Sequence, residues 1–167
     1  MAQPNWLIIP LSAFIPIILG FIWYHPKVLG TKLAQTTGYS IEERTSNRTI
    51  GRLLLIYLFG ILLSYVMTLI SVHQVGVFQL FFMDPQFAEG TSEFNQVVNE
   101  FMDKYGDRHR TFGHGLLHGL EFSLCLGLSF FGTTAFMQGR PLKGIWIHLG
   151  FWLLSCGLVA GINCAFF

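Results

Sequence analysis

The chain has 167 residues, of which 52% are hydrophobic and 11% are charged, and its formal net charge is +1. A composition so poor in charge excludes an ordinary soluble domain, whose surface needs more charged side chains. The basic residues belong to short segments between apolar runs, so they give no support for nucleic-acid binding. We therefore expect a protein whose main partner is the lipid bilayer.

Four apolar runs cover most of the sequence, at residues 6–24, 53–72, 112–137 and 144–166. Each run is close to or above the length that a helix needs to cross the ~30 Å hydrocarbon layer. An open strand would leave its backbone groups unpaired in lipid, so each run is expected to be a helix. The sequence predicts an all-α membrane protein, a compact bundle of four transmembrane helices that forms one integral membrane domain over residues 1–167. No basic residue precedes the first run, which favours a span over a signal peptide.

The first run ends in a motif with the features of a membrane boundary: Trp23, Tyr24, His25, Pro26, Lys27 and Gly30. Pro26 ends the helix because it lacks an amide proton and disfavours helical geometry at His25. The two aromatic residues are expected to anchor the helix at the membrane surface, Lys27 to meet the headgroups and Gly30 to permit a turn. A substrate-binding role for Tyr24 and His25 is the alternative.

The first loop and the end of the second run also contain local patterns that predict helix boundaries. Ser40 to Glu43 has the pattern of a capping box, which predicts the start of a short helix. Residues 75–83 are also apolar, so the second helix either extends beyond residue 72, as far as residue 83, or breaks near Gly76 into an interfacial segment.

The second loop is predicted to contain a short amphipathic helix. Between Phe94 and Tyr105, apolar residues recur at helical spacing with polar residues between them, and Gly106 follows. We expect this helix to lie flat on the outer membrane boundary or to cap the bundle. Docking of a partner protein is the alternative.

The distribution of basic residues predicts the orientation in the membrane. Loops 25–52 and 138–143 together hold seven Lys and Arg residues, whereas residues 84–111 hold three among six acids. Because basic residues accumulate on the cytoplasmic side, both termini and the second loop should be external. We expect a multi-pass protein of the bacterial inner (cytoplasmic) membrane with loops 25–52 and 138–143 in the cytoplasm.

Small residues recur every four positions in two runs and predict close helix packing. They are Gly60, Ser64 and Thr68 in the second run, and Gly115, Gly119, Ser123 and Gly127 in the third. Such stripes let helices approach closely in lipid, where van der Waals contact drives association. We expect the second and third spans to pack on each other within one subunit, with a homo-oligomer seam as the alternative.

Ionisable residues on the third run are the main functional signal. His114, His118 and Glu121 are spaced i, i+4 and i+7, so they lie within about 60° of one another on a helix. The second span runs in the opposite direction and brings His73 to the same outer face, and His109 lies just before the third span. Imidazole and carboxylate groups so placed chelate a transition metal or relay protons. The candidate metal ligands are His73, His114, His118 and Glu121.

Three interpretations of this cluster stay open. The histidines hydrogen-bond across packed helices in a structural role, or they bind a metal, or they line a path for protons or a small solute. About 13 Å below Phe112 along the helix, Glu121 needs a partner or must be neutral. No other catalytic motif is present, so a membrane enzyme using His118 and Glu121 as acid and base is the weakest hypothesis. The first hypothesis is a non-enzymatic structural or accessory subunit with a membrane-protein partner, and the alternative is a small metal-binding or transport protein. No cofactor is predicted beyond a possible transition metal.

Two segments resemble the recurring motifs of a known family. They are Gly20-Phe-Ile-Trp-Tyr-His-Pro-Lys-Val-Leu-Gly30 and Phe112-Gly-His-Gly-Leu-Leu-His-Gly119. With their spacing and the acidic second loop, the chain resembles the small bacterial membrane proteins grouped as domain of unknown function 1761, and most of all the Bacteroidota-type members. It departs from them at residues 31–34, where such proteins often carry a Trp. The resemblance implies four helices and a bacterial inner membrane, and no activity.

Overall fold

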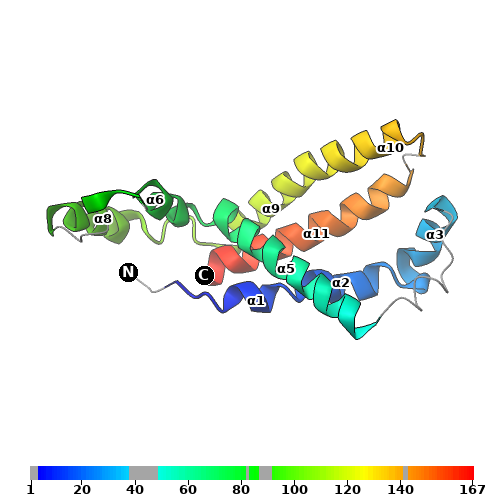
Figure 1. Cartoon of the computed structure of the whole chain (residues 1–167), viewed down its shortest axis with the longest axis horizontal. Coiled ribbons are helices and arrows are strands. Elements are labelled where there is room, and N and C mark those ends of the chain that lie inside the picture. Colours follow the sequence, from blue (N-terminus) through cyan, green and yellow to red (C-terminus); the bar gives the residue numbers. More distant parts are fainter. Residues whose placement is uncertain (1–3, 38–48, 82, 87–91, 141–142) are drawn as a thin grey trace.

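The computed structural model describes residues 4–37, 49–81, 83–86, 92–140 and 143–167, and every regular element in these ranges is helical (Figure 1). The helices are α1 (Ile8–Ser12), α2 (Ile15–Trp23), α3 (Thr31–Thr37), α5 (Ile50–Ser71), α6 (His73–Phe81), α8 (Ser92–Tyr105), α9 (Phe112–Gly127), α10 (Thr133–Met137) and α11 (Lys143–Phe166). Short π-helical segments, Pro26–Gly30 and Leu128–Gly132, precede α3 and α10. The all-α prediction is confirmed. The predicted capping box at Ser40 lies outside the described residues.

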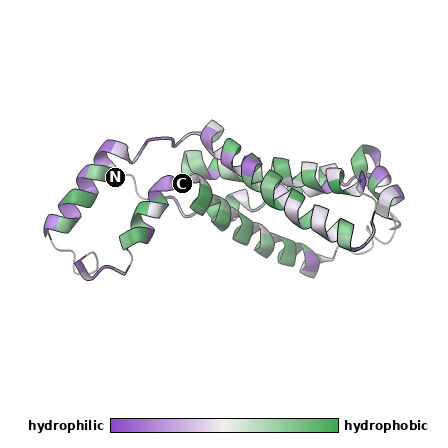
Figure 2. Ribbon diagram, turned by 90° about the horizontal axis from the view of Figure 1, so that it is seen from above, coloured by the Kyte–Doolittle hydropathy of each residue, from purple (hydrophilic) through white to green (hydrophobic). Residues whose placement is uncertain are grey.

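Three helical segments are long and apolar enough to cross a membrane. They are Ile50–Ser71, Phe112–Met137 and Lys143–Phe166, and a fourth crossing results if Ile8–Trp23 and Pro26–Thr36 count as one broken span. Large apolar side chains on the outward face of α5 are exposed, Leu54 and Leu62 among them, which suits contact with lipid. Figure 2 shows the same apolar character along the long helices. The chain is therefore compatible with three or four membrane crossings.

The first predicted span is interrupted twice. Pro16 lies in the first turn of α2, where its missing amide cannot donate to the carbonyl of Ser12, so α1 and α2 are separate helices. At the second break, His25 is extended, with φ −66° and ψ 140°, and the helix axis bends by 55°. The effect of Pro26 on His25 is as predicted, but the chain then re-enters helix.

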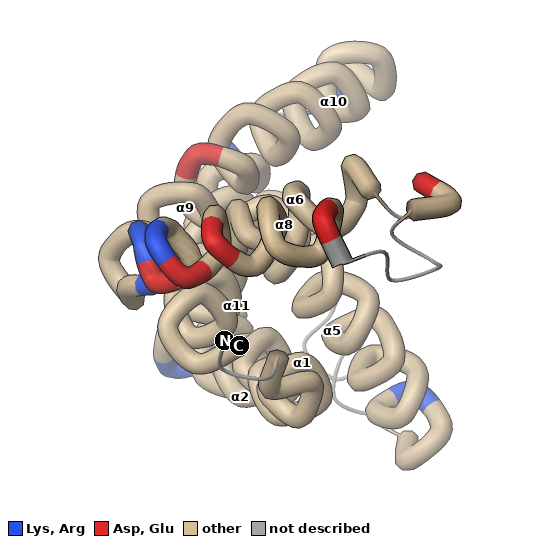
Figure 3. The backbone as a smooth tube through the Cα atoms, turned by 90° about the vertical axis from the view of Figure 1, so that its left-hand side faces the viewer, with Lys and Arg blue, Asp and Glu red and all other residues tan. Residues whose placement is uncertain are grey.

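Both chain termini lie at one end of the bundle, whereas α3, the end of α10 and the start of α11 lie at the other (Figure 1). This arrangement places residues 26–36 on the same side as the end of α10 and the start of α11, as the sequence predicts. Figure 3, viewed from the end with the termini, shows acidic and basic residues gathered on and beside α8. The side that faces the cytoplasm stays a prediction.

The tightest helix contact joins α9 to α11. A Cβ atom at Gly115 would collide with the carbonyl of Ala160, and one at Gly119 would collide with the carbonyl of Cys156. The glycines thus let the two backbones touch, as small residues do in membrane helix pairs. The second and third spans, which were expected to pack on each other, touch only over a short stretch, because α9 packs along α11, the most buried of the three membrane-length helices.

The small residues of α5 face α1 and α11 instead. Gly60 lies against the backbone of Ala13, and Ser64 Oγ lies 2.7 Å from Ser12 Oγ. Asn163 of α11 donates through Nδ2 to Ser64 O at 3.0 Å and to Thr68 Oγ1 at 2.9 Å. Hydrogen bonds between helices satisfy polar groups that cannot reach water, so this contact fixes the rotation of α5 about its axis.

The helices α6 and α8 extend beyond the end of the bundle (Figure 1). Val72 leaves helical geometry, with φ −101° and ψ 89°, so the second helix breaks four residues before the expected position at Gly76. The amphipathic helix predicted from Phe94 is present as α8, and its Val98 and Met102 are buried. Phe81 and Phe94 pack edge to face at 5.0 Å. The second helix therefore does not continue to residue 83, and α8 lies beside α6 rather than across the helix ends.

Candidate metal centre

Three histidine side chains meet where α5, α6 and α9 come together. His73 is the first residue of α6, and His114 and His118 occupy successive turns of α9. The Nε2 atom of His114 lies 2.9 Å from Nε2 of His73 and 3.1 Å from Nε2 of His118. One ring nitrogen of each residue lies within 4.8 Å of the other two. Each residue thus offers one nitrogen to a common point.

Local structure explains the placement of each residue. A spacing of four residues puts His114 and His118 on one helical face. Thr111 caps α9, and its Oγ1 accepts a hydrogen bond from the amide of His114 at 3.2 Å. The break at Val72 turns the chain so that His73 faces the first turns of α9 instead of continuing the line of α5.

The three nitrogens cannot fully satisfy one another. A neutral imidazole carries one N–H donor and one acceptor nitrogen, so His114 Nε2 either donates or accepts but does not do both. The Nε2 atoms of His73 and His118 therefore compete for the single proton or the single lone pair of His114 Nε2. A cation would replace this competition with three coordinate bonds. Zinc–nitrogen bonds of about 2.0–2.1 Å require N···N separations of roughly 3.4 Å in tetrahedral geometry, which small side-chain shifts would reach.

His109 forms an additional part of the cluster. Its ring stacks on that of His114, with centroids 4.9 Å apart and an interplanar angle of 25°. Its φ of 65° lies in the left-handed region, which a residue other than glycine adopts at a cost. The amide of Thr111 and the thiol of Cys164 both donate to the carbonyl of His109, at 2.9 Å and 3.3 Å. These contacts hold the strained residue in place.

Glu121 stands outside the group of converging nitrogens. Its Oε2 lies 3.8 Å from Nδ1 of His118, and its side chain is 69% exposed against 24% for His118. The partner expected for Glu121 is present, and its side chain lies on an exposed face of α9. Gly119 faces α11, and Glu121 follows it by two residues, about 200° around the helix, so it points away from α11.

The charge state of His73 suits metal binding. Partial burial, followed by the neighbouring His118 and His109 imidazoles, lowers the pKa of His73 from its ordinary value. The direction is the one expected when desolvation and like charges disfavour the imidazolium form. The lowered pKa favours the neutral imidazole, the form that binds a metal.

The aromatic residues of the first motif contact α11. Trp23 Nε1 donates to the carbonyl of Ile147 at 2.9 Å, and the Tyr24 hydroxyl lies 3.1 Å from Nδ1 of His148. His25 is exposed, and its Nδ1 accepts from the amide of Lys27 at 3.2 Å. The motif thus joins the end of α2 to α11, a contact that its resemblance to a boundary anchor did not indicate.

These features define a helical protein with three or four helices of membrane-crossing character and a cluster of histidines at one end of the bundle. The chain matches the family described as "Protein of unknown function (DUF1761)" over residues 7–164, and it belongs to that family. The family resemblance inferred from the two motifs is confirmed, and the likeness to Bacteroidota-type members stays a prediction. No curated protein and no solved structure gives a significant match. The family description assigns no activity, so the histidine cluster is the main indication of function.

Proposed function

We propose that this protein is a four-span protein of the bacterial inner membrane that binds a divalent transition-metal ion through His73, His114 and His118. In this proposal the termini and the metal centre are on the external side. The observation that supports it is the convergence of three ring nitrogens from two helices on one point. Imidazole is a ligand for zinc, copper, nickel and iron, and three such ligands leave a position open for water or another ligand.

Glu121 would hold His118 in the orientation that binds the metal. Metal-bound histidines usually donate their other ring N–H to a carboxylate, which fixes the tautomer and raises ligand basicity. With Nδ1 of His118 3.8 Å from Glu121, a small side-chain movement would form that bond and leave Nε2 free for the metal. The carboxylate would thus orient His118 without being a ligand itself.

A purely structural role for the cluster has less support. The glycines of α9 already seat this helix on α11, at Gly115 and Gly119, away from the histidine face. The histidines are partly exposed at the end of the bundle, so they add little buried contact. A cluster that is not needed for packing, and whose three ring nitrogens lie close together, is better explained by a ligand.

Zinc titration of protein purified without a polyhistidine tag tests the proposal. The chelator-treated wild type is expected to bind one equivalent. Replacing one ligand, as in His114→Ala or His118→Ala, should weaken zinc binding by more than about 10–100-fold. That range is the usual cost of losing a group that hydrogen-bonds to a metal ligand. His25→Ala is the matched control because His25 is exposed at the other end of the protein. Less than a tenth of an equivalent in the wild type would reject the proposal.

A further inference from the structure

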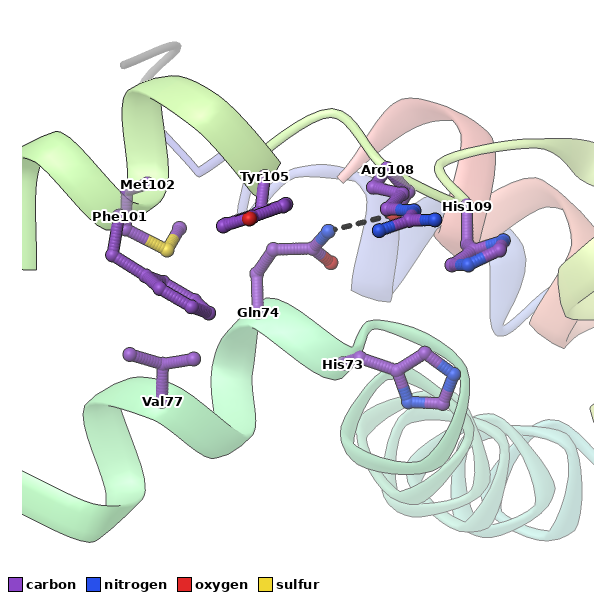
Figure 4. A pocket seen from close by; sticks show the side chains of 8 residues that line it. All are labelled: His73, Gln74, Val77, Phe101, Met102, Tyr105, Arg108 and His109. Carbon is purple, nitrogen blue, oxygen red and sulfur yellow. Dashed lines mark hydrogen bonds between the residues drawn. The ribbon is translucent and has the colours of Figure 1, made fainter.

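A cavity of about 420 Å³ lies between α6 and α8, beside the histidine cluster. Figure 4 shows the side chains that line it, with Val77, Phe101 and Met102 at one end and His73, Arg108 and His109 at the other. Its volume falls within the range of small-molecule sites, about 300–1,000 Å³. The cavity therefore has room for a ligand of modest size.

The two ends of the cavity differ in polarity and charge. The end formed by Val77, Phe101 and Met102 offers only apolar atoms. The other end carries the Arg108 guanidinium, and no Asp or Glu is among the described residues that line the cavity. A cation without a carboxylate beside an apolar wall is complementary to a ligand that has an anionic head and an apolar chain.

Contacts around Arg108 hold the cationic end in place. Gln74 Nε2 donates to the carbonyl of Arg108 at 2.9 Å, and the amide of Arg108 donates to the carbonyl of Tyr105 at 3.0 Å. The guanidinium lies 6.0 Å from the centre of the Tyr105 ring, within cation–π range. A head group would therefore meet a partly ordered cation, which lowers the entropic cost of binding.

The position of the cavity suits a ligand that comes from the membrane surface. At the end of the bundle α6 begins and α8 ends (Figure 1), and exposed apolar side chains, Leu80, Met83 and Phe101, lie on and around these two helices. Amphiphiles concentrate at such a boundary, with the head in water and the chain in the acyl region.

We propose that this cavity binds a fatty acid, with its carboxylate on Arg108 and the start of its chain against Val77, Phe101 and Met102. The inference goes beyond metal binding, because Arg108 and Val77 do not belong to the histidine cluster. Binding of the fatty acid does not require a bound metal ion.

Binding of radiolabelled dodecanoate to the full-length protein in nanodiscs of zwitterionic lipid, with a chelator present, tests the inference. Empty nanodiscs give the background of partition into lipid. The wild type is expected to show one saturable equivalent above that background. Arg108→Gln should weaken binding about tenfold, because a charge-assisted contact is lost. Val77→Trp should abolish binding because it fills the apolar end. Lys104→Gln is the matched control, since it removes one positive charge near the end of α8, four residues before Arg108, at a position that does not line the cavity.

Dodecanol gives a second measurement that does not depend on the folding of any variant. The alcohol has no anionic head, so it is expected to bind the wild type about as weakly as dodecanoate binds Arg108→Gln. Uptake that does not saturate, or equal binding of the acid and the alcohol, would overturn the inference. Zinc titration of Arg108→Gln separates the two proposals, because the zinc affinity of this variant should equal that of the wild type. Saturable binding of dodecanoate would support the fatty-acid site even if the wild type binds no zinc.

Discussion

The Nε2 atoms of His73 and His114 lie 2.9 Å apart, although the two residues are 41 positions apart in the sequence. The contact requires that the chain break after α5, so that α6 begins at His73, and that α9 lie in a fixed position at the end of the bundle. The break occurs at Val72, and the position of α9 is set by its glycines, which pack on α11 on a face other than the histidine face.

The contact of α9 with α11 should be sensitive to a single methyl group. Gly119→Ala places a Cβ against the carbonyl of Cys156, and the helices must separate. We expect a loss of about 1–3 kcal/mol, the usual cost of overpacking, measured as a lower Tm in detergent. Gly113→Ala is the control on the same helix, because a Cβ there meets nothing within 4 Å. Its Tm should equal or exceed that of the wild type, and equal losses in both variants would contradict the packing.

The hydrogen bonds of Asn163 should contribute measurably to stability. This fully buried side chain donates to Ser64 and Thr68 of α5, and Asn163→Ala removes these bonds. Interhelical hydrogen bonds in membranes contribute about 0.6 kcal/mol on average and up to about 1.7 kcal/mol. We therefore expect a loss of roughly 1–2 kcal/mol in unfolding measurements. Asn99→Ala, at an exposed position on α8, is the control and should leave stability unchanged.

Glu121 should affect metal affinity and leave stability almost unchanged. Its side chain is 69% exposed and fills no packed interior, so neither Glu121→Leu nor Glu121→Gln should lower the Tm. Because Glu121 would accept a hydrogen bond from His118, its loss should lower the zinc affinity. Glu121→Leu should weaken zinc binding about 10–100-fold, and Glu121→Gln should weaken it less. Glu93→Gln, on α8, is the control. A lower Tm for Glu121→Leu with unchanged zinc affinity would favour the structural interpretation of the cluster.

The orientation predicts a labelling pattern in intact cells. In a background in which Cys125, Cys156 and Cys164 are replaced, Glu93→Cys should react with a membrane-impermeant maleimide. Lys32→Cys should react only after permeabilisation, because seven basic residues against three predict a cytoplasmic first loop. Both positions are exposed, so accessibility within the fold does not limit the reaction. The reverse pattern would invert the proposed topology.

Features that depend on local sequence were predictable. The runs 53–72, 112–137 and 144–166 correspond closely to α5, the α9–α10 segment and α11, because a membrane-length apolar run determines a helix by itself. The common face of His114 and His118 follows from the helical period. The extended backbone at His25 follows from the chemistry of Pro26.

Features that depend on the choice of neighbours were not predictable. A stripe of small residues permits close approach but does not name the partner, so Gly115 was expected to face α5 and instead faces α11. Trp23 and Tyr24 have the composition of a surface anchor, and only the packed structure places them on Ile147 and His148. Glu121 is exposed because α11 packs on the glycine face of α9, and Glu121 lies on the opposite face. Local sequence thus determined the helices and the residues that share a face. Tertiary structure decided which faces meet, because in lipid every helix surface is apolar and only shape and a few polar contacts distinguish one neighbour from another.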